Sequence, residues 1–182
     1  MLAALPHQDL VPPSDVNTSA LAFGWTGNAF APHISLARSC KTLLCRTSSS
    51  GTSSGSCSAE QQRLACALLA KHNSGALDLA TRHPSGVSDN AYAYNNIRDM
   101  CNGNQAARSS YSCSTCPSGT PGGSVCLTMN LLNYLTRLVS RGHVIVNELA
   151  GACHSCTSRH YNGQAVDLHN DARTREYLDT CE

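Results

Sequence analysis

Apolar residues recur at helical spacing in two parts of the chain. In the first, Ser58 supplies an N-cap and Glu60 an acidic first turn, and the apolar positions that follow before Gly75 are Leu64, Leu68 and Leu69. The second runs from Ser124, a candidate cap, to Gly142, and carries one stripe of Leu127, Leu131, Leu132, Leu135, Leu138 and Val139. The spacing predicts helices over 58–75 and 124–142.

A short β-branched pattern follows the second predicted helix. The run HVIV from His143 to Val146 is typical of a buried strand, and the segment from Gln164 to Leu168 is its expected partner. Two stretches dense in Gly, Asn, Ser and Pro, 82–90 and 102–123, are predicted loops. The ordered part of the chain is therefore predicted to be an α+β domain.

A change of composition at residues 47–58, TSSSGTSSGSCS, indicates the domain organisation. Ser, Thr and Gly provide neither hydrophobic period nor bulk there, as in a flexible or O-glycosylated linker. Residues 1–46 contain four prolines and no sustained period, so we expect a flexible arm that is extended or partly disordered. Residues 59–182 form the expected ordered domain.

Eleven cysteines in 182 residues predict that disulfides brace this domain. Two Phe and one Trp give the core little aromatic bulk, so such cross-links matter more. The pairs Cys113-x-x-Cys116 and Cys153-x-x-Cys156 admit an alternative, a structural zinc site with four thiolate ligands. Because 36 residues separate the pairs and seven other cysteines are present, disulfide pairing is the simpler interpretation.

The cysteine content also predicts an oxidising compartment and hence secretion. The first residues, MLAALPHQDLVPP, lack a basic region and an apolar core of a secretory signal, so we expect a missing or misassigned N-terminus. A net charge of +1 and 14% charged residues argue against nucleic acid or an anionic membrane surface as partner. No apolar run approaches the roughly 18 to 20 residues of a membrane span.

Candidate chemistry concentrates between Glu148 and His169, where Glu, Cys, His and Asp all occur within 22 residues. His160 offers an imidazole and Asp167 a hard oxygen, a mixed pair suited to a zinc ion that keeps an open position for water. Gly163 permits a tight turn between them, and the small Ala165 allows close approach of backbone or ligand. These residues predict half of a zinc site.

The segment Ser158-x-His160-x-x-Gly163-x-Ala165-x-Asp167 resembles the S-x-H-x-x-G-x-A-x-D signature of zinc D-Ala-D-Ala carboxypeptidases and dipeptidases, whose fold is shared by the Hedgehog signalling domain. All five fixed positions match, over less than a tenth of the chain. The resemblance implies a Hedgehog/DD-peptidase-like fold, His160 and Asp167 as the first two zinc ligands, and Ser158 as a supporting residue that forms hydrogen bonds near the metal or substrate.

The resemblance leaves the third ligand and the general base without matching positions. In the family, a histidine several tens of residues downstream completes the site and an acidic base precedes it closely, whereas only 15 residues follow Asp167 here. His169 would share a strand face with Asp167 and is the nearest substitute; His154 and His143 rank below it. Glu148, ten residues before the motif, is the candidate base. C-terminal truncation, loss of catalysis and recruitment of another histidine all remain open.

By resemblance, we expect a zinc-dependent peptidase or amidase-type hydrolase that acts on D-Ala-D-Ala-type bonds of peptidoglycan stem peptides. The alternative is a non-catalytic secreted module that keeps the fold with an incomplete zinc site and binds a peptide, a glycan or a partner protein. A chance match of loop residues, with His160 and Asp167 as an ordinary structural pair, is the third interpretation. No nucleophile elbow, phosphate loop or dinucleotide fingerprint suggests another mechanism.

Overall fold

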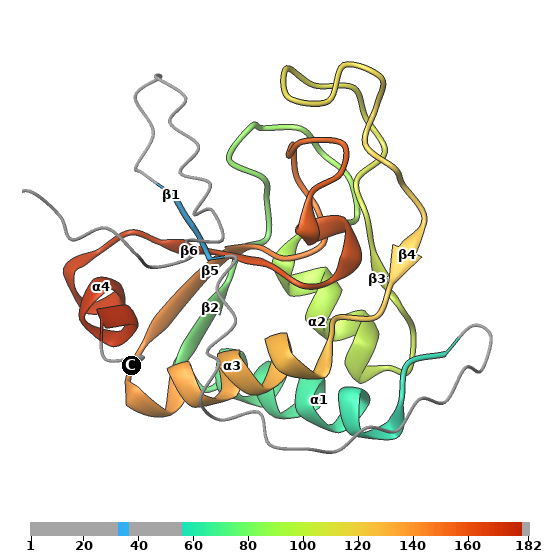
Figure 1. The fold of residues 1–182 in the computed structure, drawn as a ribbon. Coiled ribbons are helices and arrows are strands. Elements are labelled where there is room, and N and C mark those ends of the chain that lie inside the picture. The colour runs from blue at the N-terminus through green and yellow to red at the C-terminus, as the bar shows by residue number, and fades with distance from the viewer. Residues whose placement is uncertain (1–32, 37–55, 180–182) are drawn as a thin grey trace, which may run out of the picture.

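The computed structural model describes residues 33–36 and 56–179 (Figure 1). The predictions for residues 1–46 and for the 47–58 linker lie mostly outside these ranges. The described part is a mixed α+β structure, which confirms the predicted class. Its helices are α1 (Ala59–Asn73), α2 (Ala93–Cys101), α3 (Met129–Arg141) and α4 (Ala172–Asp179), with a 3-10 turn η1 (Arg159–Asn162).

The described strands form a four-stranded and a two-stranded sheet. The larger one has the order β1 (His33–Leu36), β6 (Val166–His169), β5 (Val144–Glu148) and β2 (Leu77–Leu79). β5 and β6 pair with each other, as predicted, in antiparallel orientation, while β2 joins β5 in parallel. The smaller sheet pairs β3 (Ala106–Ala107) with β4 (Ser124–Val125).

Helix α1 begins at the predicted cap. The Ser58 hydroxyl accepts a hydrogen bond from the Gln61 backbone N–H at 3.2 Å, and the Gln61 side chain accepts one from the Ser58 backbone N–H at 2.8 Å. This reciprocal capping box satisfies two N–H groups that the helix itself leaves unpaired. The helix ends at Asn73, and Gly75 follows it with a positive φ of 76°.

Helix α3 confirms the predicted stripe but begins four residues later than predicted. Its buried side chains are Leu131, Leu132, Leu135, Leu138 and Val139. The N-cap is Thr128, whose hydroxyl accepts from Leu131 N–H, whereas Ser124 belongs to β4. Pairing with β3 keeps Ser124 extended, so the helix cannot begin there. Gly142 ends α3 as predicted.

The hydrophobic pattern does not reveal α2. This helix spans nine residues, and its N-cap, Tyr92, provides no side-chain hydrogen bond, so neither length nor a cap distinguishes the segment in the sequence. Ile97 and Met100 are fully buried against the core, and the Cys66–Cys101 disulfide joins the end of α2 to α1. Tertiary packing and a cross-link therefore stabilise this helix.

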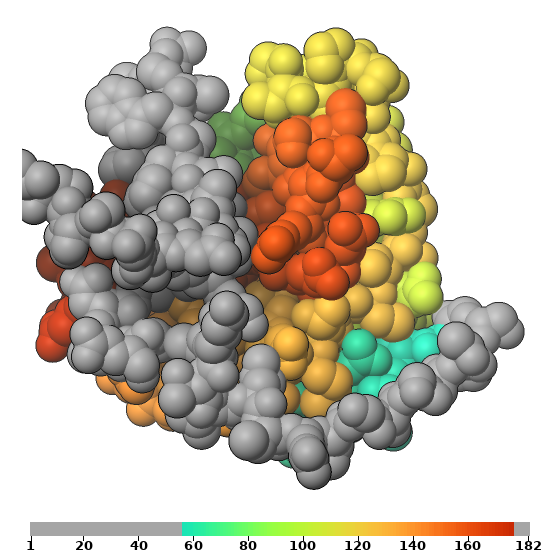
Figure 2. Space-filling view, viewed as in Figure 1, coloured from blue at the N-terminus to red at the C-terminus, as the bar shows by residue number. Residues whose placement is uncertain are grey.

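The core lies between the larger sheet and the helices α1, α2 and α3, which Figure 1 shows on one side of it. Leu77 and Leu79 from β2, Val144 and Val146 from β5 and Leu168 from β6 are buried against the leucines of α1 and α3. Aliphatic side chains fill this core. The opposite face of the sheet carries loops, and Figure 2 shows residues 149–163 packed against the loop 108–123 there.

Four disulfides cross-link the described residues: Cys57–Cys126, Cys66–Cys101, Cys113–Cys153 and Cys116–Cys156. The prediction of a disulfide-braced domain is confirmed. The two CxxC motifs are disulfide partners of each other, so their sulfurs are not thiolates and the four-thiolate zinc alternative does not apply to this structure. Cross-links of this number indicate an oxidising environment.

Gly163 of the motif is required by its surroundings. Its φ is +65°, and a Cβ atom there would lie 2.6 Å from the Cys126 carbonyl oxygen and 2.9 Å from the Leu127 Cα. The Gly163 carbonyl also accepts a hydrogen bond from Thr128 N–H, the cap of α3. The glycine therefore fastens the turn between His160 and Asp167 directly onto the start of α3.

We expect Gly163→Ala to destabilise the protein more than Gly86→Ala. Both glycines have positive φ, but a Cβ at Gly86 would meet nothing within 4 Å. Gly86→Ala should cost only the backbone penalty of about 1–2 kcal/mol, whereas Gly163→Ala adds about 1–3 kcal/mol of overpacking. Urea unfolding of the oxidised proteins measures both, and equal losses would contradict the close packing described here.

Candidate metal centre

Three side chains of the described residues bring potential metal ligands together. One ligand atom each from His154, His160 and Asp167 lies within 4.8 Å of the other two. The three residues come from a loop, from η1 and from β6. Two of them are the ligands predicted from the sequence motif, and the third is a histidine that the sequence ranks below His169.

A register shift between β5 and β6 aligns two carboxylates. Val146 pairs with Leu168, and both face the core, so Asp167 projects to the opposite face because side chains alternate along a strand. The irregularity between Val146 and Glu148 then pairs Glu148 with Asp167. A bulge at this point turns Glu148 toward the face that carries the metal-ligand group.

His160 is held by the turn that the motif encodes. Ser158 caps η1, and its hydroxyl accepts a hydrogen bond from His160 N–H at 3.4 Å. The His160 ring is buried, and its Nδ1 lies 2.6 Å from the Leu149 carbonyl oxygen, to which it donates. This bond orients Nε2 toward Asp167, whose Oδ1 lies 3.3 Å away. Ser158 therefore supports the site by shaping the turn.

His154 reaches the group from a loop without regular secondary structure. Its ring stacks on His160 with centroids 3.8 Å apart and an angle of 7° between the planes. The Gly151 carbonyl accepts a hydrogen bond from the ring, while Nε2 is buried, has no hydrogen-bond partner and lies 3.9 Å from Asp167 Oδ2. Both imidazoles thus use one nitrogen for a backbone carbonyl and direct the other to the same point, as metal-binding histidines do.

The electrostatics keep His154 in the form that binds metals. Burial lowers its pKa to about 4, and the positive charge that His160 carries when protonated lowers it further, against the raising effect of Asp167. A neutral imidazole offers a lone pair to a metal, whereas an imidazolium does not. His154 is therefore ready to bind a cation at neutral pH.

The group does not contain His169, the third-ligand candidate from the sequence. His169 lies on β6 two residues beyond Asp167, and the third member of the group is His154. His143 is not in the group either. It directly precedes β5, and its Nε2 lies 3.4 Å from the carboxylate of Asp78 on β2.

Glu148 is almost completely buried and belongs to a second polar group. His83 Nδ1 lies 2.9 and 3.0 Å from its two carboxylate oxygens, and His83 Nε2 lies 2.7 Å from Asp89 Oδ1. Burial raises the pKa of Glu148 to about 7, although His83 opposes this effect. Burial would lower the pKa of His83, but Glu148 and Asp89 outweigh it and raise that pKa.

This second group is connected by hydrogen bonds to the loop of His154. Asp89 Oδ2 accepts from the Ser109 hydroxyl at 2.6 Å, and the Ser109 oxygen accepts from Ala152 N–H at 2.9 Å. The Ala152 carbonyl accepts from the Tyr161 hydroxyl, which in turn accepts from His154 N–H. One continuous chain of polar contacts therefore joins Glu148 to the segment that carries the third potential ligand.

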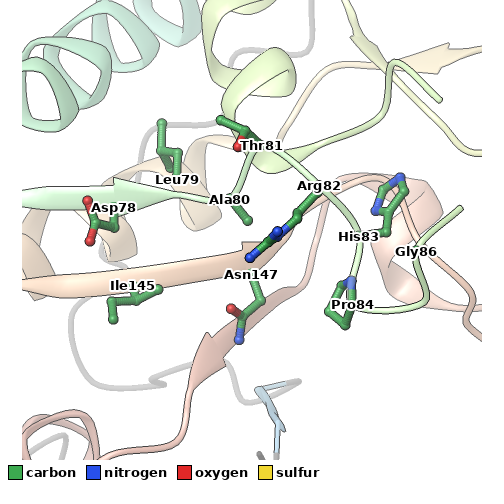
Figure 3. Close-up of a pocket in the computed structure, with 10 residues that line it drawn as sticks. All are labelled: Asp78, Leu79, Ala80, Thr81, Arg82, His83, Pro84, Gly86, Ile145 and Asn147. Carbon is green, nitrogen blue, oxygen red and sulfur yellow. The ribbon is translucent and has the colours of Figure 1, made fainter. Parts of the chain in front are cut away.

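A groove of about 560 Å³ runs along β2 and β5 beside His83. Figure 3 shows its lining residues, which extend from Asp78 and Ile145 at one end to His83 and Gly86 at the other. Arg82 and Asn147 lie between them. The groove thus extends along β2 and β5 as far as His83, which contacts Glu148.

His83 and Asp89 are not among the site residues that the sequence predicts. Both lie in the predicted loop 82–90, and 65 residues separate His83 from its partner Glu148. No motif joins the two, because parallel pairing of β2 with β5 brings them together. The sequence does contain a feature that points to His154: this histidine lies between Cys153 and Cys156, six residues before His160.

No protein-family model matches this chain, and neither the curated proteins nor the solved structures contain a significant match. Among the described residues, no helix is both long enough and apolar enough to cross a membrane.

The stability of the metal-free protein should depend on His154 between about pH 6.5 and 4. The unfolded chain protonates this histidine below its usual pKa of 6.5, while the folded protein does not until about pH 4. The free energy of unfolding should therefore decrease as the pH is lowered from about 6.5 to 4, by up to about 3 kcal/mol from His154 alone.

Urea unfolding of wild type, His154→Gln and the exposed His143→Gln at several pH values isolates this contribution. Glu148 acts in the opposite direction in all three proteins, so the slopes must be compared with one another. His154→Gln should flatten the dependence of stability on pH, and His143→Gln should not. The same slope in all three would show that His154 is not held neutral.

Proposed function

We propose that this protein is a zinc-dependent hydrolase of the D-Ala-D-Ala carboxypeptidase type, secreted into an oxidising environment, which cleaves peptide bonds of peptidoglycan stem peptides. The observation that carries the proposal is the convergence of two imidazole nitrogens and a carboxylate on one point. His154 Nε2 is buried there without a hydrogen-bond partner. A buried polar atom in that state indicates a ligand, because leaving it unsatisfied costs about 1–3 kcal/mol.

The donor set fits zinc. Two neutral imidazoles and one carboxylate are the ligands of catalytic zinc sites, which use three protein side chains and keep a fourth position open. His154, His160 and Asp167 would hold the ion, with the Gly151 and Leu149 carbonyls fixing the two rings from outside. His154 thereby takes the place of the family's downstream histidine.

When bound, zinc supplies Lewis acidity that polarises a substrate carbonyl and acidifies a water molecule. Glu148 is opposite Asp167 in the strand register and would take the proton from that water at its carboxylate oxygen. A carboxyl group with a pKa near 7 can both accept this proton and return it to the leaving amine. His83 holds the Glu148 carboxylate by its contacts with both oxygens.

The substrate class and the fold family rest on the motif. Four of its five matched positions support this proposal: Ser158 and Gly163 cap the turn that carries His160, and Asp167 lies on β6. We propose on this basis that the domain has a Hedgehog/DD-peptidase-like fold. The groove beside β2 and β5 offers room for the peptide part of a substrate.

A second function is a secreted module that binds metal and ligand without cleavage. The specific observation in its favour is the enclosure of Glu148, which is 2% exposed and has both carboxylate oxygens within 3.0 Å of His83 Nδ1. A general base must reach the water that it activates. If Glu148 keeps these contacts when substrate binds, the protein would bind without catalysis.

Zinc titration of the metal-free protein tests the proposed ligands. We expect wild type to bind one zinc ion per chain. Substitution of a residue that holds a metal ligand from the outer shell typically weakens metal binding about 10- to 100-fold, and the ligand variants His154→Ala, His160→Ala and Asp167→Asn should each weaken zinc binding by more than this. His169→Ala is the matched control, and should bind like wild type. Loss of zinc in His169→Ala with retention in His154→Ala would reverse the assignment.

Release of D-Ala from peptidoglycan fragments then separates the two functions. Glu148→Gln keeps the size of the side chain but cannot take up a proton, so kcat should fall by about 10²- to 10⁴-fold while zinc affinity stays close to that of wild type. A wild-type protein that binds zinc and releases no D-Ala would instead be the non-catalytic module.

A further inference from the structure

The segment from Gly151 to Thr157, which carries His154, contains no helix or strand. His160 and Asp167 are held by η1 and β6, so their positions follow from backbone hydrogen bonds. His154 has no such element, although its N–H donates to the Tyr161 hydroxyl. Two disulfides restrain its segment covalently, because Cys153 and Cys156 lie on either side of His154 in the sequence and both are bonded to the 108–123 loop.

The two disulfides join the segments in parallel. Cys113 bonds to Cys153 and Cys116 to Cys156, so each partner advances by three residues and both bonds span a separation of 40. A single cross-link leaves its two segments free to rotate about it, whereas two cross-links three residues apart also fix their relative orientation. His154 lies between these two attachment points.

The loop to which they attach is itself rigid at that point. Cys113 and Cys116 exchange two backbone hydrogen bonds, of 3.2 and 3.0 Å, across a tight turn. Cys116 is fully buried, and Figure 2 shows the loop packed against the segment of residues 149–163. The turn can therefore serve as a fixed support.

We infer that the Cys113–Cys153 and Cys116–Cys156 disulfides are positioning elements for the third metal ligand, His154, so that zinc binds more weakly at this site when the two cross-links are absent. This inference rests on the metal site of the proposed function. We expect His160 and Asp167 to keep their positions without these disulfides, because η1 and β6 hold them. The affinity for zinc should therefore fall, but two ligands would remain in place. Without the disulfides, the hydrogen bonds of His154 N–H to Tyr161 and of Ala152 N–H to Ser109 would remain, but the residues after His154 would lose their covalent attachment to the 108–123 loop.

Reduction is chemically accessible because Cys156 is exposed and Cys113 and Cys153 are half-buried. A trialkylphosphine attacks one sulfur and breaks the S–S bond. Two electrons pass from phosphorus to the two sulfurs for each disulfide. One water molecule supplies the oxygen of the phosphine oxide, and its two protons end on the two cysteine thiols. A thiol pair achieves the same reduction through a mixed disulfide and is itself oxidised to a disulfide.

The test compares zinc affinities of serine variants, measured by competition with a chromophoric chelator. Serine is used because four freed thiols can themselves bind zinc. The variant in which Cys113, Cys116, Cys153 and Cys156 are all replaced by Ser should bind zinc about 10- to 100-fold more weakly than wild type. Cys66→Ser with Cys101→Ser is the control, since it opens the disulfide between α1 and α2, whose separation of 35 residues is similar, and should keep wild-type affinity.

A thermodynamic cycle with His154→Ala shows whether the disulfides act through this ligand. If they do, adding the four serines to His154→Ala should change zinc affinity little, because the ligand that they position is already absent. Far-UV circular dichroism confirms folding. If the fourfold variant does not fold, Cys116→Ser with Cys156→Ser retains the other cross-link and takes its place.

The outcomes are distinguishable. Wild-type affinity in the fourfold variant, or an equal loss in the control, would overturn the positioning role and leave the metal site intact. If the losses of zinc affinity caused by the four serines and by His154→Ala are fully additive, the disulfides do not act by positioning His154. Failure of the oxidised wild type to bind zinc would overturn both this inference and the proposed function.

Discussion

The antiparallel pairing of β5 with β6, and the register shift within it, determines where all the chemistry of this domain lies. One face of these strands must supply Val144, Val146 and Leu168 to the core, which fixes Asp167 on the other face. Without the irregularity after Val146, Glu148 would follow the same alternation into the apolar core. The shift allows one short strand to serve the core and the polar face within five residues.

The consequence of this placement is a concentration of buried polar groups that must balance one another. Three carboxylates, of Asp89, Glu148 and Asp167, lie within a region that also contains the rings of His83, His154 and His160. Burial of charge is costly unless it is compensated. Because its pKa is raised, His83 favours the protonated form between Glu148 and Asp89, whereas His154, whose pKa is lowered, stays neutral beside Asp167 and His160. A divalent cation between His154, His160 and Asp167 would complete the balance.

The sequence could predict those features that depend on neighbouring residues. Leucine spacing revealed α1 and α3, and the β-branched run before Asn147 revealed β5, because periodic burial is a local property. His160, Asp167 and Ser158 were identified because a single turn and strand hold all three. Ser124 was assigned wrongly as a helix cap because its pairing with Ala107 lies 17 residues away in the sequence. His83 was missed and His169 was preferred to His154 for the same reason: each depends on contacts that only the tertiary fold creates.

The dependence on disulfides follows from the composition of the core. Aliphatic side chains supply most of its volume, and the segments around the metal centre bury mainly glycine, alanine and polar groups. Loops of this kind gain little from the hydrophobic effect, so their conformational entropy must be limited in another way. In the chain-entropy description, a cross-link that closes a loop of about 40 residues removes roughly 4 kcal/mol of that entropy from the unfolded state. The same covalent restraint that stabilises the fold therefore also sets the geometry of the ligand loop, which is why stability and metal affinity are expected to respond differently to the separate disulfides of this domain.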